Sequence, residues 1–222
     1  MISRGNGSPR QWRTACGDER SRVCYRRRTL LLLSSMAPEL QAYLEQLAAI
    51  EHDARRLVDG LTDVQLTWRE TPTTWSVADC LNHLLVTGRH SMKAIRRALG
   101  DARSRGLMGS GPFRHGMVGN WFVRLMDAPP AVKFKAPKAY RPELAMTVAE
   151  TLSGFFGLQQ ELARVLSEAD GIDLARTKVD NPVMPWFRLS LGQEFALTMA
   201  HERRHVWQAW RVRETMKRRP DR

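Results

Sequence analysis

Two histidines in the C-terminal part of the sequence stand four positions apart, with a glutamate directly after the first. In "LTMAHERRHVWQAW" these are His201 and His205, and with Glu202 they spell H-E-x-x-H, the pattern of a zinc metalloprotease helix. Residues four apart on a helix lie one turn apart on the same face, so both imidazoles can bind one metal ion. Apolar neighbours on that face, such as Leu197, indicate that it points largely inward. The sequence therefore predicts a metal-binding helix.

A zinc protease of this type needs a third protein ligand downstream, either a glutamate or a histidine six positions after the pair. Arg211 occupies the position six after His205, and Glu214 is the nearby carboxylate that follows. Both positions between the histidines are arginines, which suit an exposed helix flank better than a buried cleft. We therefore do not expect a protease, and we expect Glu202 to pair with a neighbouring arginine or helix. Gln208 could orient a ligand, contact a substrate or pack at the edge of the core.

A third ligand must then come from elsewhere in the chain, and His83 in "LNHLL" is the best candidate. At about 100° per residue, His83 lies roughly 160° from Leu81 of the apolar stripe but only about 60° from Cys80. Its helical phase therefore counts against a core position, although such an edge can still face a neighbouring helix in a bundle. Three other histidines have no partner at ligand spacing and are expected to be surface or partly buried residues: His52, His90 and His115.

The elements that position these residues are helices. Apolar residues recur at helical spacing in four stretches, which predict helices at about 38–60, 76–99, 142–168 and 190–217. The second and fourth helices begin with capping boxes, Ser76 with Asp79 and Ser190 with Gln193.

The connection between the second and third predicted helices spans residues 100–141 and is rich in Gly, Pro and Lys. An apolar cluster at 117–126 could form a short helix, whereas the prolines of "KFKAPKAYRP" favour extended chain. Four long helices with one long crossover predict an all-α fold, a four-helix bundle.

Charge separates the first 35 residues from the rest. Residues 1–35 carry eight arginines and two acidic residues, so half of the formal net charge of +12 falls there. The remaining surface mixes both signs without a basic, aromatic-interleaved stripe, so nucleic acid is not an expected partner. We expect residues 1–35 to be a disordered basic extension that the fold does not need, and 36–217 to be the bundle domain.

Cysteine content and hydropathy bear on the compartment. Three cysteines without framework spacing are typical of a reducing cytosol. The longest apolar run, Leu30–Leu33, is far shorter than the roughly 20 residues of a membrane-spanning helix. It is also too short for the apolar region of a secretory signal. We therefore expect a cytoplasmic protein without a membrane segment.

Two motifs of the chain resemble those of a known family. The stretch "TWSVADCLNHLL" is similar to the W-S-x-x-E-x-L-x-H-L signature of the DinB/YfiT-like metalloenzymes, and "HERRHVWQ" is similar to their closing H-x-x-x-H-x-x-Q. The resemblance covers roughly residues 38–215. It implies an up-down-down-up bundle in which a divalent metal is held by three histidines, here His83, His201 and His205. Asp79 departs from the family, which more often has Glu at that position.

The resemblance also bears on function. Better-understood relatives include thiol S-transferases and thiol-dependent isomerases, so the leading expectation is metal-activated attack of a low-molecular-weight thiol on an electrophilic substrate. Zn and Ni are the leading metals, and three imidazoles also suit Fe, Co or Mn. Two alternatives stay open, a non-catalytic bundle whose metal clamps the second and fourth helices together, and a metal-dependent hydrolase. The sequence also leaves a homodimer open.

Overall fold

The fold is taken from a computed structural model, which describes residues 36–130, 136–143, 145–180 and 187–218. The basic extension expected at residues 1–35 lies outside these ranges, so its disorder and the domain boundary at Met36 stay predictions.

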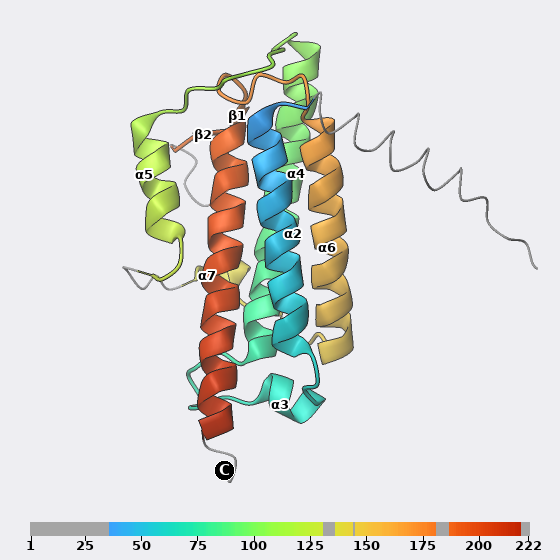
Figure 1. The fold of residues 1–222 in the computed structure, drawn as a ribbon, viewed down its shortest axis with the longest axis vertical. Coiled ribbons are helices and arrows are strands. Elements are labelled where there is room, and N and C mark those ends of the chain that lie inside the picture. The colour runs from blue at the N-terminus through green and yellow to red at the C-terminus, as the bar shows by residue number, and fades with distance from the viewer. Residues whose placement is uncertain (1–35, 131–135, 144, 181–186, 219–222) are drawn as a thin grey trace, which may run out of the picture. The chain divides into compact units, whose positions relative to one another are not determined.

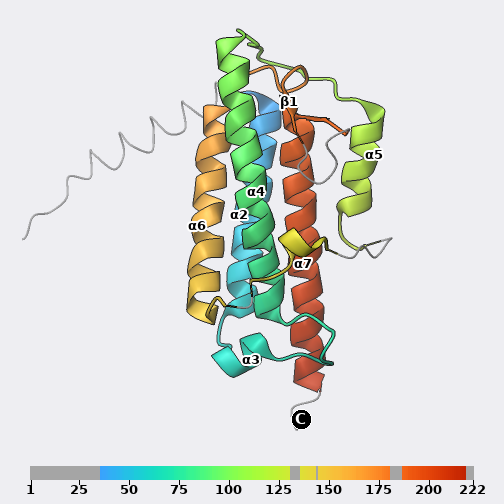
Figure 2. The same ribbon diagram turned by 180° about the vertical axis from the view of Figure 1, so that it is seen from behind.

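Four long helices make up the body of the protein: α2 (Pro38–Val58), α4 (Val77–Ser104), α6 (Val148–Glu168) and α7 (Leu191–Arg218). They lie side by side in Figures 1 and 2, where α2 and α7 run in one direction and α4 and α6 in the opposite direction. This is the up-down-down-up order, and the all-α four-helix bundle that the sequence predicts is confirmed. None of the described helices combines the length and the apolar character that crossing a membrane would require.

Capping boxes determine where three of these helices begin. In α4, the Ser76 hydroxyl accepts from the backbone of Asp79, whose carboxylate accepts from the Ser76 backbone in return. The box of Ser190 and Gln193 forms in the same way before α7. The third helix begins at Val148, six residues later than expected, because the unrecognised box of Thr147 and Glu150 caps it there.

Small residues let α4 and α6 approach closely. A Cβ atom at Gly88 would lie 2.3 Å from Leu158 Cδ2, and one at Gly154 would lie 2.6 Å from Leu85 Cδ2. The core between the helices is apolar, and its largest fully buried side chains include Phe155, Phe195, Leu40, Leu57, Leu81 and Leu162. Helix α4 continues to Ser104, five residues past its predicted end, because Ala98, Leu99 and Ala102 stay buried.

Shorter elements complete the fold. Helix α3 (Asp63–Thr67) links α2 to α4, and two-residue strands β1 (Lys178–Val179) and β2 (Leu189–Ser190) pair antiparallel ahead of α7. Neither α3 nor the strand pair was expected from the sequence. Within the proline-rich stretch, Lys138–Tyr140 forms a 3-10 helix, η1, rather than extended chain.

Helix α5 (Met117–Met126), whose position the sequence predicts, is fastened to α7 at both ends. At its start, Gln193 Nε2 donates to the carbonyl of Gly116 at 2.7 Å. At its end, the Arg203 guanidinium forms a two-point ion pair with Asp127, with N–O distances of 2.9 and 2.7 Å. Arg203 also donates to Gln46 of α2. The long connection is thereby fixed beside the turn of α7 that carries His201 and His205.

Candidate metal centre

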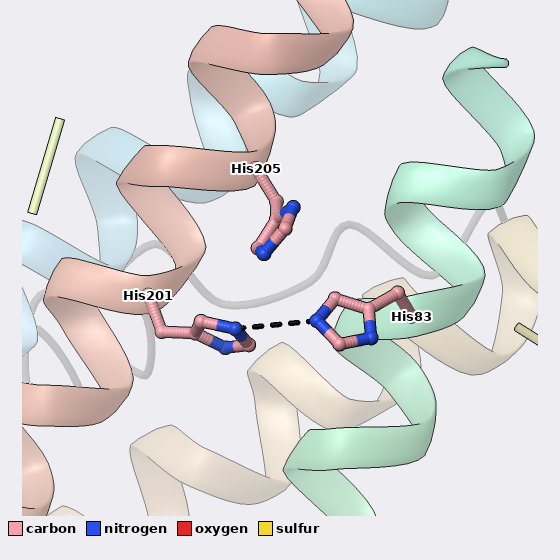
Figure 3. A group of neighbouring side chains, drawn as sticks. All are labelled: His83, His201 and His205. Atoms are coloured by element: carbon pink, nitrogen blue, oxygen red, sulfur yellow. Dashed lines mark hydrogen bonds between the residues drawn. The ribbon is translucent and has the colours of Figure 1, made fainter. Parts of the chain in front are cut away.

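His83, His201 and His205 meet in the interior of the bundle. Figure 3 shows His83 on α4 pointing toward the two histidines of α7, which lie one turn apart. The ring centroids are 4.5 to 5.0 Å apart. One nitrogen from each ring can be chosen so that the three lie within 4.8 Å of one another. The structure therefore brings together the three residues that the sequence singles out, although whether they bind metal stays a prediction.

His83 reaches this position although its helical phase departs from the apolar stripe. At this level α4 is surrounded, because every residue from Cys80 to Val86 is buried. The side of α4 away from the stripe faces α7 and η1 instead of solvent. His83 itself is only 4% exposed.

A backbone hydrogen bond orients the His83 ring. The carbonyl oxygen of Tyr140, in η1, lies within hydrogen-bond distance of Nδ1. Because a carbonyl can only accept, Nδ1 carries the proton and Nε2 presents its lone pair to the centre of the cluster. Nε2 lies 3.2 Å from Nε2 of His201. Such a bond on the outer ring nitrogen is the usual support of a metal-ligating histidine.

The three imidazoles are held in the neutral form. Burial, with added repulsion from His83 and Arg204, lowers the pKa of His201 from 6.5 to about 3. Burial is also the largest cause that lowers the pKa of His205 and that of His83. Neutral imidazole nitrogens have free lone pairs at pH 7, which is the state that binds a metal ion.

The donor set fits a divalent metal. Ring nitrogens of the three histidines face one another, and His205 Nδ1 has no hydrogen-bond partner among the described residues. Three imidazoles suit Zn, Ni, Co or Fe(II). Within the described residues the cluster contains these three side chains and no fourth one, and Cys80 is not part of it.

Glu202, the glutamate of the H-E-x-x-H pattern, faces away from the cluster. It is buried, and its Oε1 accepts from Gln159 Nε2 of α6 at 3.0 Å. This agrees with the expectation that it pairs with a neighbouring helix. Burial raises the pKa of Glu202 to about 7. Its Oε2 and the Oε1 of Gln159 both lack partners among the described residues, which a proton on Oε2 would remedy.

Two contacts of the cluster were missed by sequence reasoning. The indole of Trp75 lies against the rings of His83 and His205, with centroid distances of 4.8 and 5.6 Å. Trp75 directly precedes Ser76, the N-cap of α4, a position that gives no signal for a contact with the histidines. Tyr140 acts through its backbone carbonyl, so its side-chain type carries no signal. Gln208, the candidate for orienting a ligand, does lie at the cluster. A hydrogen bond with its side chain partly offsets the effect of burial on the pKa of His205.

A second polar cluster lies apart from the three histidines. His115 bridges Ser190 and Glu39, with Nδ1 2.8 Å from the serine Oγ and Nε2 2.8 Å from the carboxylate. This has the composition of a Ser-His-Glu triad, but Ser190 is 1% exposed and its Oγ caps α7. A Cβ at Gly192 would collide with both His115 and Glu39. The cluster therefore fastens the connection to α2 and α7, and it offers no accessible nucleophile.

The comparisons with known proteins agree with this geometry. A family model described as the DinB superfamily matches residues 46–209, about three quarters of the chain. That range contains α4 and most of α7, including all three histidines. Searches of curated proteins and of solved structures returned no match. The chain belongs to the DinB superfamily.

Proposed function

We propose that this protein is a metal-dependent transferase that activates a low-molecular-weight thiol for attack on an electrophile. The observation that carries the proposal is the convergence of three neutral imidazoles, two buried and one partly buried, without a fourth histidine, cysteine or carboxylate among the described residues. Three protein ligands leave a coordination position for a substrate, as catalytic rather than structural zinc sites do.

The roles of the residues follow from their contacts. His83, His201 and His205 would hold the metal, and the Tyr140 carbonyl keeps His83 in the required tautomer. A divalent ion bound there would stabilise the deprotonated form of a thiol or a water molecule. Trp75 packs against one side of the cluster.

The proposed reaction is a nucleophilic substitution. The thiol S–H gives its proton to solvent, and the sulfur forms a bond to an electrophilic carbon of the second substrate. The leaving group departs from that carbon with the bonding electron pair. Isomerisation is the variant in which the thiol adds to the substrate and is later expelled unchanged.

The clamp alternative is less well supported. A purely structural metal normally has all four positions filled by protein, and two conceivable fourth ligands, Cys80 and Glu202, are otherwise placed. Cys80 is fully buried outside the cluster, and Glu202 is engaged by Gln159. A hydrolase would use the same centre with water as the nucleophile, and the experiment below separates it from a transferase.

The test is a screen with metal-loaded protein purified without an affinity tag. Chelated protein is reloaded with Zn or Ni and mixed with pairs of thiols and electrophiles, and the loss of free thiol is followed. Ester and amide substrates without thiol form the hydrolase arm.

We expect turnover that requires both metal and thiol, that disappears in His201→Ala, and that persists in His52→Ala, where an exposed histidine is removed. Metal-dependent ester cleavage without thiol would replace this proposal with the hydrolase. Tight metal binding with no activity in either arm would favour the clamp.

A further inference from the structure

A cleft of about 300 Å³ opens beside α4, on the same side of the helix as His83. Its wall consists of residues from α4 and from the β1 segment: His90, Lys93, Ala94, Arg97, Ala98, Asp101, Lys178 and Asp180. None of the three histidines lines this cleft, and the metal centre does not depend on it.

The cleft continues the face of α4 that carries His83. At 100° per residue, His90, Ala94, Arg97 and Asp101 all fall within about 40° of the direction of His83. At 1.5 Å per residue, His90 lies about 10 Å and Arg97 about 21 Å along the helix from His83. Figure 2 shows η1 against α4 and α7, with β1 further along α4 toward its C-terminal end.

Tyr140 connects the cleft to the metal centre. Its carbonyl binds His83, and its ring lies 4.9 Å from the ring of His90, which lines the cleft. One residue of η1 therefore touches both the ligand cluster and the near end of the cleft. Tyr140 therefore lies between the three histidines and the near end of the cleft.

The charges of the cleft favour an anion. Lys93 and Arg97 are exposed and form no ion pair within the described part of the chain, whereas the adjacent Arg96 is neutralised by Glu161 of α6 at 2.8 Å. Of the two acids, Asp180 is paired with Arg188 at 2.9 Å. Among the described residues, Lys178 donates to the carbonyl of Ala175 alone. Within the described ranges, three cations thus face a single uncompensated carboxylate, that of Asp101.

We propose that this cleft binds the anionic end of an elongated thiol substrate whose sulfur lies at the three-histidine centre. The inference rests on the proposed function and narrows its substrate class. Side chains on a helix lean toward its N-terminus, so the Lys93 and Arg97 charges fall roughly 10–20 Å from the cluster along the axis. A thiol with its carboxylate a few bonds from the sulfur cannot span that distance, whereas one with a phosphate or carboxylate at the end of a long arm can.

The test compares 4′-phosphopantetheine with pantetheine, two thiols with the same arm that differ in the terminal phosphate. Cobalt-loaded protein is titrated with each, and the thiolate-to-cobalt absorption reports binding. We expect the phosphorylated thiol to bind about tenfold more tightly or better, a typical effect of hydrogen bonds to charged groups. Arg97→Gln should abolish that difference and leave the affinity for pantetheine unchanged. Arg96→Gln, which removes the same charge one residue away, should retain the difference.

A second measurement tests anion binding in the cleft independently of the proposed thiol chemistry. Inorganic pyrophosphate is titrated calorimetrically into metal-free wild type, Arg97→Gln and Arg96→Gln. Binding that only Arg97→Gln loses supports the cleft even if no thiol alters the cobalt spectrum, a result that would overturn the proposed function alone. Equal affinity for the two thiols, or equal weakening by both arginine variants, would overturn the cleft and leave the thiol chemistry standing.

Discussion

The replacement Glu202→Gln distinguishes a catalytic base from a buried structural acid. In the structure, Glu202 accepts from Gln159 through Oε1, while Oε2 and Gln159 Oε1 lack partners among the described residues. A glutamine amide at position 202 can accept through its oxygen and donate through its nitrogen, as a protonated carboxyl group would. We therefore expect the variant to fold and to bind metal like the parent.

The size of the expected stability difference follows from the linkage between proton binding by Glu202 and folding. Burial raises the pKa of Glu202 from 4.5 to about 7 in the folded protein, so the folded state binds the proton more tightly than the unfolded state. The stabilisation from the protonated form is complete below pH 4.5 and is lost as the pH rises toward 7. At 1.36 kcal/mol per pKa unit, the loss above pH 7 amounts to about 3 kcal/mol. Glutamine does not ionise, so the variant does not lose this stabilisation as the pH rises.

The assay is urea unfolding of both proteins at pH 4.5, 6 and 8 in the presence of a chelator, because a nearby cation would alter the titration. The variant should match the parent near pH 4.5 and exceed its free energy of unfolding by about 3 kcal/mol at pH 8. A variant that is less stable than the parent at pH 8 would refute the assignment of Glu202 as a buried structural acid. A variant that no longer binds metal would indicate that Glu202 acts at the metal centre.

Two further predictions concern packing and the cover of the cluster. Gly88→Ala should destabilise the protein by about 1–2 kcal/mol, because the added Cβ overlaps Leu158. Gly157→Ala, with open space around it, should stabilise the protein by about 0.5–1 kcal/mol. Urea unfolding measures both, and changes of the same sign in the two free energies of unfolding would contradict the close contact of α4 and α6. Ni²⁺ should quench tryptophan fluorescence mainly through Trp75, so Trp75→Phe should remove most of the quenching and Trp207→Phe, on the surface, little of it.

Local sequence rules were sufficient for much of the fold. The starts of α4 and α7 could be predicted because a capping box is a short pattern whose hydrogen bonds form within the same turn. The predicted start of α6 at residue 142 is too early, because the helix begins after the capping box of Thr147 and Glu150, which the sequence analysis does not recognise. Two-residue strands have no periodicity to detect, and their pairing depends on contacts between distant segments.

The candidate site, like the fold, could be predicted only in part from local sequence patterns. His201 and His205 could be paired from spacing alone, because one turn of helix places them together. His83 could be added only through its surrounding motif, since the phase argument assumed one buried face and α4 is buried all around at that level. The support from the Tyr140 carbonyl and the pairing of Glu202 with Gln159 depend on tertiary contacts between distant segments, which no local pattern encodes.

Metal stoichiometry in single histidine variants tests the central claim most directly. Untagged wild type, His83→Ala, His90→Ala and His201→Ala are loaded with Zn, dialysed and analysed for metal per chain, with circular dichroism to confirm helical content. We expect about one ion per chain in wild type and in His90→Ala, whose ring lies outside the cluster. His83→Ala and His201→Ala should lose the ion while keeping their helices, because the apolar core does not depend on either ring. If His83→Ala binds metal as tightly as wild type, the three-histidine centre is wrong, and the proposed chemistry is wrong with it.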